Sequence, residues 1–456
     1  MRPSCGRDAG YYRLVNMQNR ETFVVDRYKR SWSHVGTWEA SGLGLDPKRD
    51  GRTDMGRHMG RHETTLMAGT PGDLLRLIRT GEATTRAELA SMTGLARSTV
   101  AQRIDTLSER DLIKEIGEAP STGGRPPAVL GFNAGAGVVL TADLGATHSR
   151  IGVADLDGTI LVETAADIAI ATGPEEVLDW VQETFVDLLD NIGADADDVL
   201  GVGIGVPGPV EFAAGRAVNP PIMPGWDGYD IRGHFADRFA HPVLVDNDVN
   251  IMALGEHWVL PNPPDDMLFV KVATGIGSGL ILGGHLHRGA SGAAGDIGHV
   301  QVTTTDVVCR CGNTGCLEAA AGGGALASQL AEAGLDTQNG RDVVRLVRTG
   351  NRAAVQAVRE AGRLIGRVLA GTVNLLNPAL IIIGGDIAQA GEQLMAGIRE
   401  AIYQRSTALS TSDLQITVSS LGDRAGITGA AAMVIEHVLS PQNINAELEL
   451  SREAVS

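Results

Sequence analysis

The chain has 456 residues, of which 43% are hydrophobic and 20% are charged, a composition that suits a globular protein of two or three domains. The sequence has no apolar run of about 18 residues, which excludes a membrane-spanning protein. It also has no secretory signal pattern, so we expect a cytoplasmic protein. The net charge of −17 argues against a protein that binds nucleic acid. The net charge is uneven, however: it is −21 over residues 131–456, zero over residues 71–130 and +4 over residues 1–70, so the N-terminal part can still bind DNA.

Residues 1–66 are polar and have no sustained hydrophobic period, so we expect a disordered segment. A basic arm is the alternative. Met55, Met59 and Met67 could each be the true start of the protein, in which case this segment comes from an over-extended gene model.

Residues 67–132 have the pattern of a winged helix-turn-helix domain. Thr85 and Glu88 form a capping box that predicts a helix ending at Gly94. A short amphipathic helix precedes it and a third helix follows from about Ser98, which gives the spacing of a helix-turn-helix. The apolar positions expected inside these helices are Leu74, Leu75, Leu77, Ile78, Leu89, Met92, Val100, Ile104 and Leu107.

Strands at about 112–116 and 128–130, joined by a turn at 121–127, would form the wing. In this motif the N-terminal residues of the second helix meet base edges and phosphates in the major groove. Arginine and glutamine suit bases, and serine and threonine near a helix start suit phosphate. The candidate DNA contacts are Arg86, Arg97, Ser98, Thr99, Gln102, Arg103, Thr106 and the wing-tip residue Arg125. The alternative is a merely solvated polar face.

From about residue 133 the pattern becomes α/β, with lobes expected at about 133–250 and 251–440 and a C-terminal tail at 441–456. The expected strands are 138–142, 151–154, 159–163, 199–205, 243–246, 268–273, 280–282 and 380–383. The expected helices are 174–192, about 316–333 and 352–376, the last with one face in the core and the other free for a subunit contact.

Two glycine-rich segments follow strand-like residues at similar places in the two halves: Asp143-Leu144-Gly145-Ala146-Thr147 and Thr274-Gly275-Ile276-Gly277-Ser278-Gly279. Glycines let backbone N–H groups approach phosphate, and Asp143 could hold a metal ion. The repetition suggests a duplicated fold that clamps phosphates between its lobes, whereas hairpin geometry alone is the alternative. The candidate phosphate-binding residues are Asp143, Gly145, Thr147, Thr274, Gly275, Gly277, Gly384 and Gly385.

Three of the four cysteines, Cys309, Cys311 and Cys316, lie close together, and His299 precedes Cys309 by ten residues. One histidine and three thiolates make a closed tetrahedral zinc site. No coordination position stays open, so we expect a structural zinc, with free thiols as the alternative.

These motifs resemble the ROK family (repressors, open reading frames and kinases) over about residues 72–440. The resemblance is carried by 143–147, 203–208, 224–226, 247–250, 275–279, 298–299 and 309–318. It implies an actin-like ATPase (ribonuclease-H-like) fold with two lobes and a sugar in the cleft between them. The fused winged helix-turn-helix head resembles the repressor branch rather than the free-standing sugar kinases.

By the same resemblance, Asn247, Asp248, Asp296, His299 and Glu318 would contact sugar hydroxyls, which pair well with carboxylates and amides. His299 would place one ring nitrogen on zinc and the other toward the ligand. In the kinases, the residue that matches Asp248 is the base that takes the proton from the attacking hydroxyl.

The sequence departs from the kinase pattern at Ala146, His148, Ile222 and Asp296, where kinases usually carry Gly, Lys, Asn and Glu. These changes count against binding of ATP and Mg²⁺. We therefore expect a sugar-responsive transcriptional regulator of carbohydrate metabolism, with repression favoured, whose effector is a sugar or phosphosugar. An ATP-dependent sugar kinase with a DNA-binding head is the alternative because Asp248 is retained, and a ligand-independent architectural DNA-binding protein is a third. A homodimer or homotetramer is expected, since helix-turn-helix proteins usually read two half-sites.

Overall fold

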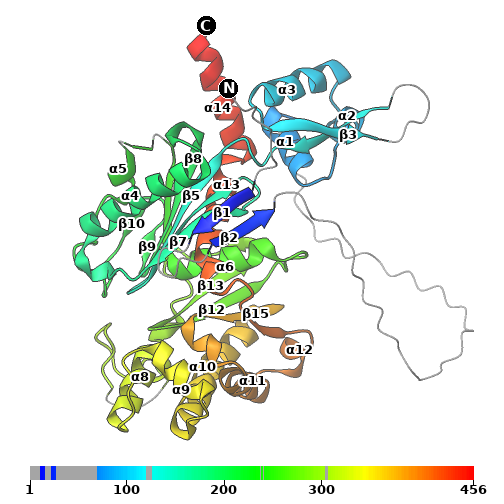
Figure 1. The fold of residues 1–456 in the computed structure, drawn as a ribbon. Helices are drawn as coiled ribbons and strands as arrows, with labels where there is room; N and C mark the ends of the chain where they lie inside the picture. Colours follow the sequence, from blue (N-terminus) through cyan, green and yellow to red (C-terminus); the bar gives the residue numbers. More distant parts are fainter. Residues whose placement is uncertain are drawn as a thin grey trace, which may run out of the picture.

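The structure, a computed structural model, describes residues 11–15, 22–26, 69–119, 126–236, 238–239, 241–302 and 307–455. It consists of a small head and a two-lobed body (Figure 1). The head contains α1 (Pro71–Arg79), α2 (Arg86–Thr93), α3 (Arg97–Glu109) and the antiparallel strands β3 (Ile113–Glu118) and β4 (Ala128–Phe132). The predicted winged helix-turn-helix arrangement is confirmed.

The local signals of the head act as the sequence predicts. The Thr85 hydroxyl accepts the Glu88 N–H at 3.3 Å, and the Glu88 carboxylate accepts the Thr85 N–H at 2.9 Å. Gly94 ends α2 with a φ of 70°, in the region that glycine adopts without strain. Eight of the nine predicted apolar positions are buried. The prediction that Met92 is buried is wrong. Its side chain is 47% exposed, because the short α2 buries only Leu89 among its own residues.

The body contains two five-stranded sheets with the same strand order, β11-β8-β5-β6-β7 and β16-β15-β12-β13-β14. In each sheet a central strand, β5 or β12, pairs antiparallel with the next strand and parallel with a strand that returns later in the chain. The predicted duplication is confirmed. The first sheet comprises β5 (Val138–Leu144), β6 (Ser149–Asp155), β7 (Ile160–Ala166), β8 (Val199–Val206) and β11 (Val243–Asn247). The second comprises β12 (Met267–Val272), β13 (Ile276–Leu282), β14 (His285–Leu286), β15 (Leu380–Gly384) and β16 (Gln415–Val418).

Two helices lie between the sheets. α13 (Ala425–Val438) packs on β5 and β8, α6 (Asp248–Val259) packs on β12 and β13, and the two helices pack on each other. They approach so closely that a Cβ on Gly429 would collide with the carbonyl of Ile251. The outer helices are α4 (Pro174–Ile192) and α5 (Ile231–Ala236) in the first lobe, and α7 (Leu317–Ala321), α8 (Gly323–Glu332), α9 (Gly340–Arg348), α10 (Arg352–Leu376), α11 (Glu392–Arg405) and α12 (Ala408–Thr411) in the second.

The predicted C-terminal tail is instead a helix, α14 (Pro441–Val455), that docks on the head (Figure 1). The Gly72 N–H at the start of α1 donates to Asn445 Oδ1 at 3.0 Å, and Arg110 pairs with Glu447 at 3.0 Å. Apolar residues of α1, α13 and α14 belong to one continuous core. The head is therefore fastened to the body through the end of the chain.

Several predicted boundaries change. The helix expected at 316–333 is broken at Gly322, and of the second glycine-rich segment only the residues before Ile276 form a turn, since the rest lies in β13. The lobe limits also fail for α13, which follows the second sheet in the chain but packs on the first. Within the segment expected to be disordered, β1 (Tyr11–Val15) and β2 (Thr22–Asp26) pair antiparallel, which corrects that prediction for these strands. The rest of residues 1–66 lies outside the described residues.

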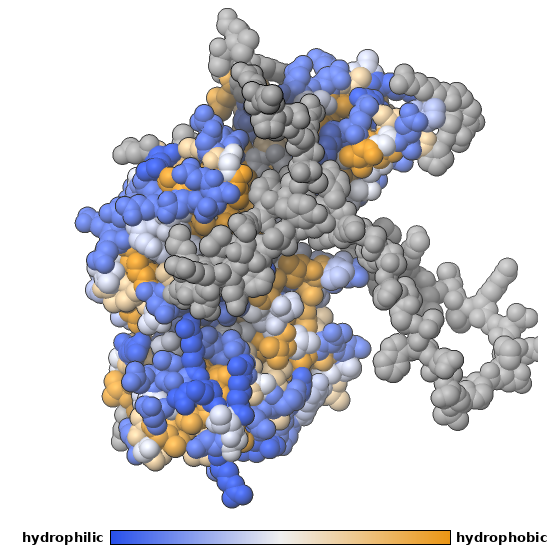
Figure 2. Space-filling model, viewed as in Figure 1, coloured by the Kyte–Doolittle hydropathy of each residue, from blue (hydrophilic) through white to orange (hydrophobic). Residues whose placement is uncertain are grey.

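The surface view in Figure 2 shows hydrophilic residues over much of this face, with hydrophobic residues in scattered groups between them. Among the described residues, no helix is both long and apolar enough to cross a bilayer.

Candidate functional site

A cavity of about 610 Å³ lies between the two lobes. Its walls come from the ends of β5 and β8, the start of α6, the turn from β12 to β13 and the short helix η3 (Ile297–His299). The side chains expected at a sugar all line it: Asn247, Asp248, Asp296, His299 and Glu318. A cavity of this size and mixed polarity suits a small ligand.

Asn247 ends β11 and caps α6. Its Oδ1 accepts the N–H groups of Val249 and Asn250 at 2.9 and 3.3 Å. Its Nδ2 donates to the Gly208 carbonyl at 2.9 Å. Most of this amide is therefore used by the protein, and the second Nδ2 hydrogen is the group left for a ligand.

Asp248, the first residue of α6, is paired with a lysine that the sequence reasoning missed. Lys271 on β12 donates to Asp248 Oδ2 at 2.6 Å, and the two side chains are only 20% and 7% exposed. Burial raises the pKa of nearby Asp143 to about 6, although Lys271 acts to lower it. Burial also acts to lower the pKa of Lys271, but Asp248 and Asp143 outweigh it and raise that pKa above its ordinary value. Three ionisable groups thus form one buried cluster.

Glu318 reaches the cavity from α7. Its Oε2 accepts the Ile276 N–H at 3.2 Å, which ties α7 to the start of β13. A Cβ on Gly275 would collide with the Glu318 carboxylate. Gly275 is therefore required for this close approach, whatever else the glycine-rich turn binds.

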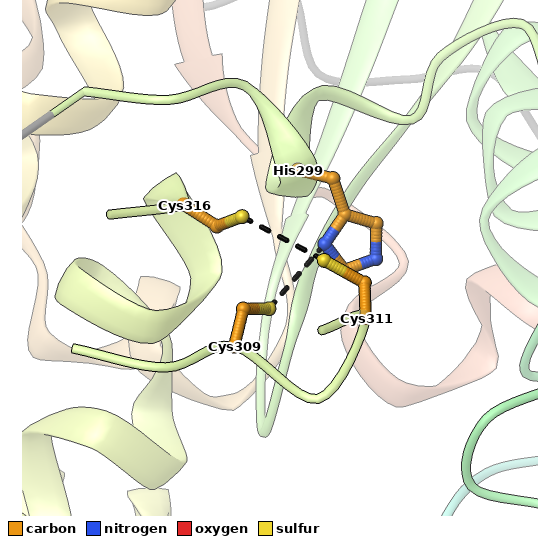
Figure 3. Close-up of side chains that lie close together, drawn as sticks. All are labelled: His299, Cys309, Cys311 and Cys316. Carbon is orange, nitrogen blue, oxygen red and sulfur yellow. Dashed lines mark hydrogen bonds between the residues drawn. The ribbon is translucent and has the colours of Figure 1, made fainter. Parts of the chain in front are cut away.

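The predicted metal ligands His299, Cys309, Cys311 and Cys316 converge, with all four ligand atoms within 4.8 Å of one another (Figure 3). His299 Nδ1 lies 3.5 Å from Cys309 Sγ, and Cys311 Sγ lies 3.7 Å from Cys316 Sγ. Tetrahedral zinc with ordinary bond lengths would separate a nitrogen and a sulfur by about 3.6 Å and two sulfurs by about 3.8 Å. The cluster can hold a metal ion, and its spacing fits zinc.

The pKa values of the three thiols indicate what a bound metal would change. Burial raises the pKa of Cys316 to about 12 and also raises that of Cys309. A backbone hydrogen bond from Asn313 lowers the pKa of Cys311. A bound metal would keep all three as thiolates at neutral pH, since metal ligation deprotonates them.

The metal cluster also positions two ligand-facing groups. The His299 Nε2 atom points away from the cysteines toward Asp296, whose Oδ1 is 3.9 Å away, and Glu318 follows Cys316 by two residues. The arrangement fits the predicted double role of His299, with one ring nitrogen for the metal and the other for the cavity.

Seven of the eight candidate phosphate-binding residues line the cavity. Gly384 does not: it lies in β15, where a Cβ would come within 2.5 Å of the Phe269 ring. Its lack of a side chain is used for packing against Phe269. The residues that depart from the kinase pattern, Ala146, His148, Ile222 and Asp296, all line the cavity. His148 is engaged by Asp167 at 2.8 Å.

Comparison with known proteins identifies the family to which this architecture belongs. Residues 139–437 match the ROK family, and residues 70–114 match a winged helix-turn-helix DNA-binding domain. The chain belongs to the ROK family. It is similar to the xylose repressor of Caldicellulosiruptor bescii, at 31% identity over 80% of this chain and 95% of that protein.

Two solved structures resemble this ROK protein. One is a ROK family transcriptional regulator described as a homologue of the E. coli MLC protein, with 25% identity, a TM-score of 0.71, and coverage of 83% of this chain and 98% of that one. The other is a ROK glucokinase from Streptomyces griseus in complex with glucose and AMPPNP, with 30% identity, a TM-score of 0.58, and coverage of 65% and 99%. The match to the solved transcriptional regulator spans both the head and the body. The chain is therefore a DNA-binding transcriptional regulator of the family.

In the head of this ROK protein, the N-terminal half of α3 faces outward. Arg97, Ser98 and Gln102 are exposed, and Thr99, Arg103 and Thr106 are half-buried. The N-cap of α3 is Ala96, which provides no side-chain cap, so free N–H groups point out at the helix start. Arg86 is exposed and pairs with Glu115 at 3.4 Å. Arg125 lies outside the described residues.

Sequence reasoning missed Lys271 and other charged side chains that line the cavity of this ROK protein. It also missed the pair of Asp246 and Arg288, 2.7 Å apart, of which Asp246 accepts a hydrogen bond from Asn250 on α6. A lysine inside the otherwise apolar strand Met267–Val272 was the available signal, because a buried lysine requires a partner. Its partner could not be identified without the fold.

Proposed function

We propose that this ROK protein represses transcription by binding operator DNA through α3, and that a monosaccharide in the interlobe cavity changes its affinity for that DNA. The observation that carries the proposal is the convergence of Asn247, Asp248, Asp296, His299 and Glu318 on one cavity, in a body fastened to a DNA-binding head. Amide, imidazole and carboxylate groups are the partners that vicinal hydroxyls need. Xylose is the first ligand to test, because a relative is named for its response to it.

The metal is proposed to be a structural zinc. The cluster supplies four ligands and leaves no open position for water, as structural sites do. Its role would be to hold His299 and Glu318 in register with the cavity. Loss of the metal would therefore remove sugar binding without altering any residue of the head.

The signal is proposed to travel through the two inner helices. α6 begins at Asp248, and α13 begins beside Asp143, where a Cβ on Gly426 would collide with the Asp143 carboxylate. α13 leads directly into α14, which contacts α1. A ligand that shifts the start of either helix would thus shift the head, and the resulting coupling need be only a few kcal/mol.

A homodimer is proposed, because two heads are needed to read two half-sites. Exposed apolar side chains on neighbouring elements of the second lobe, Leu375, Tyr403 and Leu409, offer a self-complementary contact. Light scattering tests the dimer. Replacing Leu409 with Asp should give monomers that bind DNA weakly.

Phosphoryl transfer is the competing function. The glucokinase relative is solved with glucose and AMPPNP, and Asp248 is present here. A coupled assay across pentoses and hexoses decides between the two functions. Turnover that Asp248→Asn abolishes would make the protein a kinase.

The proposed function is tested by fluorescence anisotropy of promoter DNA from upstream of its own gene, with D-xylose, D-glucose or N-acetylglucosamine. Gln102→Ala should weaken binding about tenfold, roughly 1–3 kcal/mol, whereas Ser108→Ala, at the exposed far end of α3, should not. One sugar should shift the wild-type affinity about tenfold, and Asp296→Asn should suppress that shift alone. No DNA binding at low salt, or no response to any sugar, would contradict the proposal.

A further inference from the structure

Two carboxylates lie at the base of the cavity where a divalent cation would ordinarily be expected. Asp143 comes from the end of β5, and Asp248 from the start of α6. Glycine-rich turns that can approach phosphate stand beside both. Carboxylate oxygens grouped next to such turns are the ligands that Mg²⁺ takes when it binds with a nucleotide.

A cation belonging to the protein already occupies this place. The Lys271 ammonium contacts Asp248 Oδ2 at 2.6 Å, and Asp143, which lies beyond ion-pair distance of the ammonium, adds a longer-range attraction. Both carboxylates act to keep Lys271 charged despite its burial. Asp143 Oδ1 is buried and has no hydrogen-bond partner among the described residues, so the ammonium is the main compensation for this group.

The duplicated fold explains how the lysine comes to face the carboxylates. Asp143 on β5 is opposite Gly205 on the parallel strand β8. Lys271 on β12 is opposite Gly384 on the parallel strand β15. The two residues thus occupy equivalent positions in the two sheets, and the cavity between the lobes brings their opposite charges together.

We propose that the Lys271 ammonium, paired with Asp248 and facing the charge of Asp143, replaces a divalent cation at these carboxylates, so that the cavity takes its sugar without Mg²⁺ or a metal-bound nucleotide. This inference rests on the proposed function, since it concerns the same cavity. A carboxylate held by an ammonium is a weak proton acceptor, and a phosphate chain entering here would meet two carboxylates with no metal to bridge them. The Mg²⁺–ATP chemistry of a kinase does not fit this set of residues.

The test is a titration with Mn²⁺, which reports on Mg²⁺ sites, followed by electron paramagnetic resonance of the full-length protein. Wild type should bind Mn²⁺ at least tenfold more weakly than Lys271→Met, in which the carboxylates lose their cation. The double variant Lys271→Met/Asp248→Asn should return to the wild-type affinity. The melting temperature of Lys271→Met should also be lower than that of wild type. Millimolar Mg²⁺ should raise the melting temperature of the variant and leave that of wild type unchanged.

Equal Mn²⁺ affinity in wild type and Lys271→Met would overturn the proposal. If Lys271→Met does not fold, the test compares wild type with Asp143→Asn. Binding of Mn²⁺ by wild type that Asp143→Asn abolishes would also overturn the proposal. No Mn²⁺ binding at Asp143 in wild type supports the proposal. Sugar binding is followed separately by calorimetry. A cavity that binds no sugar but shows the expected metal pattern contradicts the proposed function and leaves the role of Lys271 intact.

Discussion

The two halves of the body share one strand order but carry different chemistry. At the same position of the central strand, the first half has Asp143 and the second has Lys271. The metal cluster occurs in the second half alone among the described residues, whereas the head packs against the first half through α13 and α14, with an added contact of Arg79 on Trp258 of α6. On the proposed function, the duplicated scaffold divides its tasks: one half arranges the ligand-facing loop, and the other transmits the signal to the DNA-binding head.

Removing a metal ligand of the second half is expected to have the largest effect on this division of tasks. Cys316→Ser should cost about 4–5 kcal/mol or more, the range associated with loss of a metal site, and should abolish the sugar-induced rise in melting temperature. Elemental analysis should find about one equivalent of zinc in wild type and none in the variant. Cys5→Ser, at a cysteine that is not one of the predicted ligands, is the control. Full sugar response without zinc would contradict the account.

The charged positions of the two halves should respond differently to pH. Burial raises the pKa of Asp143 to about 6 from 3.8, so the folded state binds this proton more tightly than the unfolded chain does. The resulting stabilisation is complete below about pH 4 and is lost as the pH rises through 6, a change approaching about 3 kcal/mol. Asp143→Asn should therefore be more stable than wild type at pH 8 and lose this advantage on acidification. Urea unfolding across this range checks it; a pH-independent difference would argue against the buried carboxylate.

The glycines opposite these charges sharpen the comparison. A Cβ on Gly384 would meet the rigid Phe269 ring, whereas one on Gly205 would meet the flexible end of Ile251. Gly384→Ala should cost roughly 1–3 kcal/mol, and Gly205→Ala clearly less. Thermal unfolding ranks the two. The reverse order would show that the second half is the more adaptable of the two.

The smallest effect concerns the contact of the first half with the head. Asn445→Ala removes the acceptor for the Gly72 N–H and should cost about 1 kcal/mol. It should also reduce the effect of sugar on DNA binding without changing the DNA contacts themselves. Glu447→Gln, which weakens an exposed ion pair with Arg110, should cost less than about 0.5 kcal/mol. An unchanged sugar response in Asn445→Ala would exclude this route.

Features encoded locally could be predicted from the sequence. The capping box at Thr85, the cluster from Cys309 to Cys316 and the adjacent strands expected at 151–154 and 159–163 each depend on neighbours in the chain, and the structure contains all three. Recognition of the ROK motifs supplied the two-lobed fold and the residues that line the cavity. That resemblance also carried the five sugar candidates, which lie far apart in the sequence.

Features created by packing were missed. α6 and α13 are buried on most sides, so their sequences are apolar nearly all round and lack the period that reveals a surface helix. The pairing of Lys271 with Asp248 joins two elements through the tertiary fold. The packing of Gly384 on Phe269 was also missed, because a glycine pair after a strand looks the same in the sequence whether it admits a phosphate or an aromatic ring.

The most direct test of the central claim is reciprocal calorimetry. The responding sugar is titrated into the free protein and into the protein saturated with operator DNA, and the DNA affinity is measured with and without sugar. If the cavity and the head are coupled, the two ratios must be equal and differ from one, by about tenfold on this account. Equal sugar affinities in the free and DNA-bound protein would contradict it, because a ligand that does not distinguish the two states cannot regulate DNA binding.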